Sequence, residues 1–276
     1  MLKTRVMTGA VLSVIIATVL IFSHIPWVLN ITVAALCVQA IYELYNAVGL
    51  KGKKVLYLIS YLVAIIISFF ELPGYSYITA TLFAAAILLF VYLFVNIKTK
   101  TRIKPAVSVL MAIMIVFFFK TMSYIRKLDG GVFLLGGAVL ISVLTDIAAY
   151  FVGRGCGKHK LAPIISPKKT VEGSIGGTVY AVAILMVVAF ILNATHVLQV
   201  SYGMLILYLI LASIVGQFGD LALSSIKRIV GIKDYGNLLP GHGGILDRFD
   251  SLLFVLPFTY LFFKLVGYII CLKEVL

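Results

Sequence analysis

The sequence predicts an all-α integral membrane protein, a polytopic bundle of about nine transmembrane helices. Of its 276 residues, 62% are hydrophobic and only 12% are charged, and the mean hydropathy is +1.14. Apolar runs close to the roughly 20 residues that a helix needs to cross the hydrocarbon core recur along the whole chain. Almost no polar face separates these runs, which excludes a soluble globular domain.

The expected spans follow one another with short connections. The first span follows Lys3 and Arg5 and has no small-x-small cleavage site near residues 21–27, which indicates a retained signal anchor. No internal repeat and no linker long enough to separate two domains is visible. The nine expected ranges are 6–22, 28–48, 55–71, 75–96, 105–123, 130–152, 172–193, 203–229 and 249–271.

The Lys and Arg residues predict the orientation. Most of the 23 lie before the first span and in every second connection after it, so these segments are expected to face the cytosol, the N-terminus included. The cluster between Lys120 and Lys127 is the exception. The net charge of +13 is thereby explained by topology and anionic lipid head groups, without a nucleic-acid partner. The cytosolic cations are Lys3, Arg5, Lys51, Lys53, Lys54, Lys98, Lys100, Arg102, Lys104, Arg154, Lys158, Lys160, Lys168, Lys169, Lys227, Arg228, Lys233 and Arg248.

One membrane domain is expected over residues 1–276. Residues 1–129 are expected to be mainly scaffold, and residues 130–276 to carry catalysis with cytosolic loops at 153–172 and 230–248. The three cysteines, Cys37, Cys156 and Cys271, lie far apart without CxxC spacing, which argues against a disulfide framework or a zinc site.

Carboxylates within and beside the apolar spans are the strongest indication of chemistry. Asp220 lies about 24 Å along the eighth span, near its cytosolic edge. Ser224 and Lys227 share its helix face, as expected of a water-filled cavity wall. Asp247 and Asp250 stand on adjacent turns at the start of the ninth span. Asp220 and Asp247 together would form an oxygen site suited to Mg²⁺. The alternative is that such acids pair with Lys or Arg only to hold helices together.

A glycine-rich turn precedes these last acids. Pro240-Gly241-His242-Gly243-Gly244 has no bulky side chain except His242. Glycines let backbone amides approach a phosphate, so Gly243 and Gly244 are candidate phosphate contacts and His242 a candidate contact to a phosphate or a nucleotide. A lone loop histidine is more often an ordinary surface residue.

A second polar tract runs from Asp146 to Gly177. Its Gly-x-Gly-x-Gly-Lys piece is not a P-loop, because Val152 and His159 occupy the required glycine and Ser/Thr positions. Lys168, Lys169 and Thr170 instead precede the seventh span, where cations and free helix amides suit a triphosphate. The alternative is a basic cytosolic loop with glycines for helix packing.

The stretch from Ser225 to Asp250, SIKRIVGIKDYGNLLPGHGGILDRFD, resembles the signature of the phosphatidate cytidylyltransferases (CDP-diacylglycerol synthases). The run Ser166-Pro-Lys-Lys-Thr-Val-Glu-Gly173 is also similar to one in that family. The resemblance implies that CTP and phosphatidic acid react to give CDP-diacylglycerol and pyrophosphate. It also implies a Mg²⁺ cofactor and a homodimer, while the presence of a second cation stays open. The compact chain fits a bacterial plasma membrane, with the active site facing the cytosol.

The resemblance implies roles for the candidate residues. Asp220 and Asp247 would bind the metal, supported by Asp250 and Asp146. Lys168, Lys169 and Arg248 would engage phosphates, and Lys227 or Arg228 the lipid phosphate. The remaining candidates for substrate binding are Thr170, Glu172, Ser225, His242, Gly243 and Gly244.

The sequence bears on three alternative functions. A CTP-dependent polyprenol or lipid-alcohol kinase would transfer the γ-phosphate instead, and the complete Ser-x-Lys-Arg to Asp-Arg-x-Asp match argues against it. A CDP-alcohol phosphotransferase requires an Asp-Gly-x-x-Ala-Arg start that is absent here. An ion-coupled transporter would be favoured by inverted repeats, and none is visible.

Overall fold

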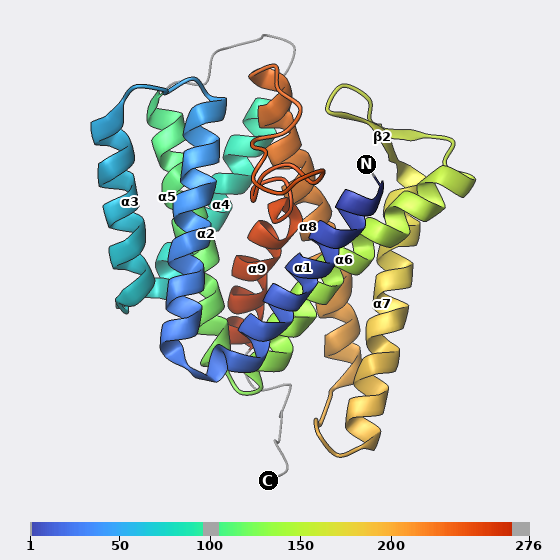
Figure 1. Ribbon diagram of the computed structural model, residues 1–276. Coiled ribbons are helices and arrows are strands. Elements are labelled where there is room, and N and C mark those ends of the chain that lie inside the picture. The colour runs from blue at the N-terminus through green and yellow to red at the C-terminus, as the bar shows by residue number, and fades with distance from the viewer. Residues whose placement is uncertain (1, 96–104, 267–276) are drawn as a thin grey trace.

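The computed structural model describes residues 2–95 and 105–266, and within them the chain is a bundle of α-helices (Figure 1). The expected all-α polytopic fold is confirmed. Each expected span corresponds to one helix. The helices are α1 (Leu2–Ile21), α2 (Pro26–Ala47), α3 (Lys54–Phe69), α4 (Tyr75–Val95), α5 (Pro105–Arg126), α6 (Gly131–Cys156), α7 (Val171–Ala194), α8 (Tyr202–Ile229) and α9 (Asp250–Val266), with the short 3-10 helix η1 (Phe22–His24) after α1.

Seven of these helices are long and apolar enough to cross a membrane. Helix α3 has only 16 residues, which makes it about 24 Å long. Helix α9 has 17 described residues, and the rest of its expected range, with Cys271, lies outside the described residues. The cations expected at 98–104 also lie outside them.

A small β-hairpin, which was not expected, follows α6. Strands β1 (Lys160–Ala162) and β2 (Ser166–Thr170) are antiparallel, with Lys160 opposite Thr170 and Ala162 opposite Ser166. Such short strands carry no apolar alternation that would reveal them in the sequence. The hairpin projects from one end of the bundle, beside the start of α7 (Figure 1).

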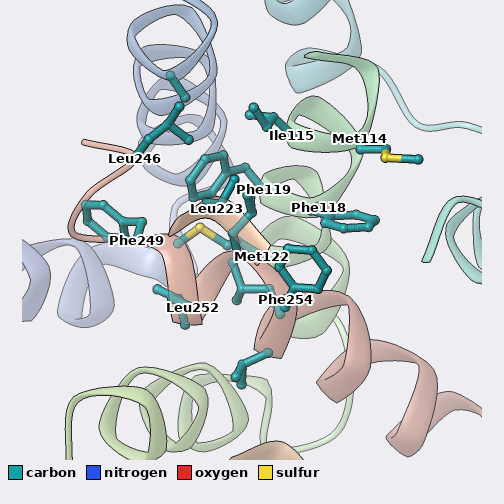
Figure 2. Close-up of a cluster of buried hydrophobic side chains, with 14 of the residues drawn as sticks. Met114, Ile115, Phe118, Phe119, Met122, Leu223, Leu246, Phe249, Leu252 and Phe254 are labelled. Carbon is teal, nitrogen blue, oxygen red and sulfur yellow. The ribbon is translucent and has the colours of Figure 1, made fainter. Parts of the chain in front are cut away.

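The buried centre of the bundle forms where α5, α8 and α9 meet. Helix α9 packs against α4, α5, α6 and α8. Figure 2 shows aromatic and aliphatic side chains of α5 and α9 filling the space between these helices. Because lipid tails are as apolar as these side chains, the close packing stabilises the bundle through van der Waals contact. The core holds the N-terminal end of α9 beside α8, and this positions the polar groups described next.

Candidate active site

Three carboxylates converge at the end of the bundle that carries the hairpin. Asp146 comes from α6, Asp220 from α8, and Asp250 is the first residue of α9. Asp250 interacts electrostatically with both other acids. Ser251 Oγ donates a hydrogen bond of 3.1 Å to Asp146 Oδ2, which joins α9 to α6. Like charges gathered in this way require compensating cations.

Two lysines supply much of that compensation. Lys169 of β2 forms an ion pair with Asp220 Oδ2, and Ser224 Oγ donates to Asp220 Oδ1 at 3.1 Å. Lys227 interacts electrostatically with Asp220 and Asp250, although its direct hydrogen-bond partner is Asp247. The Asp220 side chain remains 19% exposed. A solute can therefore reach this carboxylate.

Asp247 is bound more completely by the protein. Lys227 Nζ donates to its Oδ1 at 2.8 Å, while the amides of Tyr235 and Gly244 donate to its Oδ2 at 2.7 and 3.0 Å. Its side chain is only 2% exposed. The two acids expected to share a metal thus have different direct partners. Asp220 contacts Lys169 and Ser224, whereas Asp247 accepts amides of the 230–248 loop, and Lys227 interacts with both acids.

Tyr235 belongs to the same loop network. Its hydroxyl donates to the carbonyl of Leu223 at 2.9 Å, and Lys227 Nζ lies 5.5 Å from the centre of its ring. Burial raises the pKa of the Tyr235 phenol well above its ordinary range, and the carboxylates of Asp247 and Asp250 raise it further. The phenol therefore stays neutral and acts as a hydrogen-bond donor.

The glycine-rich turn uses its amides internally. The amides of His242 and Gly243 both donate to Leu239 O. Gly241 and Gly243 have φ of +77° and +91°, which explains why glycine is needed there. His242 Nδ1 is buried and has no hydrogen-bond partner within the described residues. Phosphate binding through these amides would require the turn to open, whereas His242 has an unused polar atom.

The hairpin places its three candidate residues differently. Thr170 is the N-cap of α7, and its Oγ1 accepts the amide of Gly173 at 3.1 Å. Lys169 points to Asp220, while Lys168 is exposed. Glu172 accepts the amides of Lys158 and His159 at 3.1 and 3.2 Å, as well as the His159 ring Nδ1 at 2.6 Å. Glu172 therefore stabilises the turn before the hairpin.

Three further candidates flank this centre. Arg228 Nε donates to Ile165 O at 2.9 Å, which ties the end of α8 to the hairpin. Ser225 Oγ donates to Ala222 O of its own helix at 2.6 Å and is buried. Arg248 is exposed and interacts electrostatically with Asp146. Of the three, Arg248 is the side chain best placed to meet an incoming anion.

Small residues bring α8 and α9 close enough for these contacts. A Cβ atom at Gly219 would lie 2.8 Å from Asp250 O and 2.8 Å from the ring of Phe254. A Cβ atom at Gly216 would lie 3.1 Å from Val255. Glycine at these positions permits the close approach of the two backbones. Without it, Asp250 could not stand beside Asp220.

Sequence reasoning missed Glu43 of α2. This carboxylate is 1% exposed and accepts the amides of Ile245 and Leu246, each at 2.9 Å. It is an acid inside an expected transmembrane span, and that rarity is the signal that could have found it. Nothing in the sequence pairs it with a loop more than 200 residues away.

A partly buried polar network between α6, α7 and α8 was also missed. The hydroxyl of Ser213 is 3.0 Å from that of Thr145 and 2.9 Å from that of Thr178. Gln217 Nε2 donates to Thr178 Oγ1 at 3.0 Å, and Ser174 Oγ donates to Gln217 Oε1. Such interhelical hydrogen bonds hold α7 against α8 about one helical turn before Asp220. Single Ser and Thr residues in apolar spans give no sequence signal for it.

The donor set bears on metal binding. In the part of the chain that the structure describes, no three His, Cys, Asp or Glu residues form a group able to hold a metal ion by themselves. Mg²⁺ however typically binds through one or two carboxylates together with water and substrate phosphates. Asp220 and Asp247 each keep acceptor capacity beyond their present hydrogen bonds. The chemistry of these donors therefore suits a magnesium ion, and Asp220 is the one of the two whose side chain is partly exposed.

Comparison with known proteins places these features in context. The sequence model of the Cytidylyltransferase family matches residues 3–266. The chain is 39% identical over 268 residues to the phosphatidate cytidylyltransferase of Bacillus subtilis. The aligned region covers 94% of this chain and 96% of the relative. The chain is 36% identical over 258 residues to that of Staphylococcus haemolyticus, covering 93% and 96%. A Staphylococcus aureus relative is 36% identical over 267 residues, with the same coverage.

Proposed function

The chain belongs to the cytidylyltransferase family, and on that premise we propose that it transfers the cytidylyl group of CTP to phosphatidic acid. The products are CDP-diacylglycerol and pyrophosphate, and the protein is thereby an enzyme of phospholipid biosynthesis. The observation that carries the proposal is the group of Asp146, Asp220 and Asp250 with Lys169 and Lys227, at the end of a membrane bundle. Relatives named for this activity match along almost their whole length.

The reaction needs two polyanions to meet. A phosphate oxygen of phosphatidic acid attacks the α-phosphorus of CTP, a new P–O bond forms, and the bond to the β-phosphate bridging oxygen breaks as pyrophosphate leaves. The acceptor oxygen is already an anion, so no strong general base is needed. Catalysis of this kind depends on positioning and on stabilising charge.

The cations of the site are assigned from where they lie. Lys169, Arg248 and Lys168 are proposed to bind the phosphates of CTP. Lys169 pairs with Asp220, Arg248 is exposed and interacts electrostatically with Asp146, and Lys168 is the exposed neighbour of Lys169 in β2. Lys227 or Arg228, at the end of α8, is proposed to bind the lipid phosphate. Lys169 would have to exchange its contact with Asp220 for one with substrate. The remaining polar candidates, Thr170, Glu172, Ser225 and His242, are proposed to shape the binding surface around them.

Asp220 and Asp247 are proposed as the protein ligands of Mg²⁺, with Asp146 and Asp250 supporting them. When bound, the ion supplies positive charge that offsets the phosphates. The carboxylate chemistry fits, since Mg²⁺ prefers hard oxygen donors. A second cation would be accommodated by the same acids.

The site's position suits one soluble and one lipid substrate. Asp220 lies on a helix long enough to span a membrane, and the hairpin and 230–248 loop extend from the same end. We propose that this end faces the cytosol of a bacterium at its plasma membrane, with the N-terminus on the same side. We further propose that residues 1–276 act as one membrane domain and that two copies associate as a homodimer.

The test uses detergent-purified protein with phosphatidic acid, Mg²⁺ and CTP labelled either in the cytidine or in the γ-phosphate. Cytidine label in the lipid and γ-label in pyrophosphate, both lost on chelation of Mg²⁺, are expected. Transfer of the γ-label to the lipid would instead identify a kinase. Absence of both transfers in folded, lipid-replete protein would contradict an enzymatic function and favour a transporter.

A further inference from the structure

We propose that Glu43, in the second helix, is a positioning residue for the transfer reaction. Its carboxylate holds the backbone of Ile245 and Leu246, so that Asp247 is kept in place beside Lys227 at the active site. The inference rests on the proposed function for its catalytic consequence, while the contact itself is independent of that function. Glu43 belongs to the part of the chain expected to be mainly scaffold.

Both oxygens of Glu43 are bound by the loop. Oε1 accepts the amide of Ile245 at 2.9 Å, and Oε2 accepts the amide of Leu246 at 2.9 Å. Gln39, one turn earlier on α2, donates its Nε2 to Oε1 at 2.9 Å. The partners in the loop are 202 and 203 positions away in sequence, so the contact joins the two halves of the molecule.

The loop is shaped around this carboxylate. A Cβ atom at Gly236 would lie 3.0 Å from Glu43 Oε1. A Cβ atom at Gly244 would overlap the Glu43 carboxylate. Two glycines of the signature are therefore explained by a protein carboxylate that occupies the space beside them.

The direction of the amides explains why an anion is required. Ile245 O accepts the amides of Arg248 and Phe249, so residues 245–249 form a helical turn that leads into α9. The amides of Ile245 and Leu246 at the start of this turn point outward together, as they do at a helix N-terminus. Such amides attract an anion, and Glu43 provides it from within the protein.

Glu43 and Asp247 together satisfy three successive amides. Gly244 donates to Asp247, while Ile245 and Leu246 donate to Glu43. Asp247 also accepts Lys227. A shift of the turn would therefore move Asp247 and disturb its contact with Lys227 of α8. Helix α2 is a suitable anchor, since it has 22 residues and packs against α3 and α5.

Energetics favour a positioning role over simple stabilisation. Glu43 is 1% exposed, and none of the ion pairs within the described residues includes it. Burying a charge without a cation is costly, so the carboxylate at this position is explained by the amides it binds rather than by the burial of its side chain. What the carboxylate adds is a fixed direction for two neighbouring amides.

The decisive experiment compares Glu43→Gln with the wild type in the cytidylyl-transfer assay and by amide hydrogen exchange. The amide group of Gln has a similar shape but turns one acceptor into a donor that faces a backbone N–H. We expect kcat per folded molecule to fall by about a hundredfold, since small displacements of catalytic groups have effects of that size. KM for CTP should change less than about twofold, because a group that acts on the reacting geometry affects kcat. Exchange in peptides covering 239–249 should rise, with α5 unchanged.

Two further variants make the result interpretable. Glu71→Gln is the matched control: Glu71 is an exposed acid that pairs with Lys127 at the other end of the bundle, and neither kcat nor loop exchange should change. Gln39→Leu removes one donor to Glu43 without altering the buried charge, and it should lower kcat several-fold. This variant replaces Glu43→Gln in the test if Glu43→Gln cannot be purified in a folded state.

Wild-type kcat per folded molecule in Glu43→Gln, or in Gln39→Leu where only that variant folds, would overturn the inference. Unchanged exchange at 239–249 would overturn it as well. If the wild type itself showed no cytidylyl transfer, the proposed function would fail, and the exchange measurement would still decide whether Glu43 holds the loop.

Discussion

The carboxylates of the site differ in what holds them. Asp220 contacts the side chains of Lys169 and Ser224 and keeps an accessible surface. Asp247 accepts two backbone amides and a buried lysine, and it is almost fully enclosed. Substitution of the two should therefore have different consequences, even though both acids are proposed to bind Mg²⁺.

We expect Asp220→Asn and Asp247→Asn both to lower kcat/KM by at least about a hundredfold, because each removes charge from the reacting centre. Only Asp247→Asn should also destabilise the fold, by about 3–5 kcal/mol, since it leaves Lys227 buried without its partner. Asp220→Asn should leave stability near the wild-type value, because it relieves repulsion from Asp146 and Asp250. Thermal unfolding in detergent and the lipid-product assay measure the two effects.

Asp129→Asn serves as the control for this pair. Asp129 is exposed in the connection between α5 and α6, away from the acids of the site. The same chemical change should leave both activity and stability near wild type. Equal destabilisation by Asp220→Asn and Asp247→Asn would contradict the distinction drawn between the two acids.

Helices α8 and α9 act as a pair whose separation sets the site. Asp250 and Ser251 begin α9, Asp220 lies on α8, and the glycines at 216 and 219 let the two backbones approach. The hairpin adds Lys169, held to the end of α8 through Arg228. The active centre is thus mainly a product of helix packing, to which the hairpin contributes Lys169.

We predict that Gly219→Ala pushes α9 away from α8. The new methyl group would meet the carbonyl of Asp250 and the ring of Phe254 at 2.8 Å, and overpacking of this kind costs about 1–3 kcal/mol. The expected result is a lower unfolding temperature together with at least a tenfold loss of kcat, measured on the same preparation.

Gly203→Ala is the matched control, since a Cβ atom there meets nothing within 4 Å. It lies in the first turn of the same helix and should be neutral. Full activity in Gly219→Ala would mean that the spacing of α8 and α9 does not control the site.

In the whole molecule, the loops that form the site lie at one end of an apolar bundle. The hairpin, the 230–248 loop and the end of α2 that carries Glu43 lie together there (Figure 1). Thr8 of α1 also donates to Pro240 O at 3.1 Å, so the first two helices both touch the loop. A soluble nucleotide and a membrane lipid can meet at such an end, provided that it faces the compartment that holds CTP.

Single cysteines introduced at Lys160 and Asp129 test this orientation in a background without the native cysteines. Both positions are exposed, one in the hairpin and the other in the connection between α5 and α6. In intact cells, a membrane-impermeant thiol reagent should label Asp129→Cys only, and Lys160→Cys should react only after the membrane is opened. Labelling of Lys160→Cys from outside would reverse the proposed topology.

Much of this molecule was predictable from local sequence. The helices were predictable because a span of apolar residues must satisfy its backbone hydrogen bonds within the membrane, and a helix does so locally. The hairpin was not, since its strands are too short to show a pattern. For the site, the sequence pointed to the acids of α6, α8 and α9, because charge in or beside a membrane span is costly and therefore conspicuous.

The sequence by itself determined the fold class, the helices and the polar end of the bundle on which the acids lie. Only the tertiary structure decided which groups meet there: Lys169, rather than Lys227, forms the ion pair with Asp220, and Asp247 holds Lys227 and two loop amides. It also decided that Glu43 binds the loop. Helix formation depends on neighbouring residues, whereas these partners are brought together by packing between distant segments and leave no local pattern.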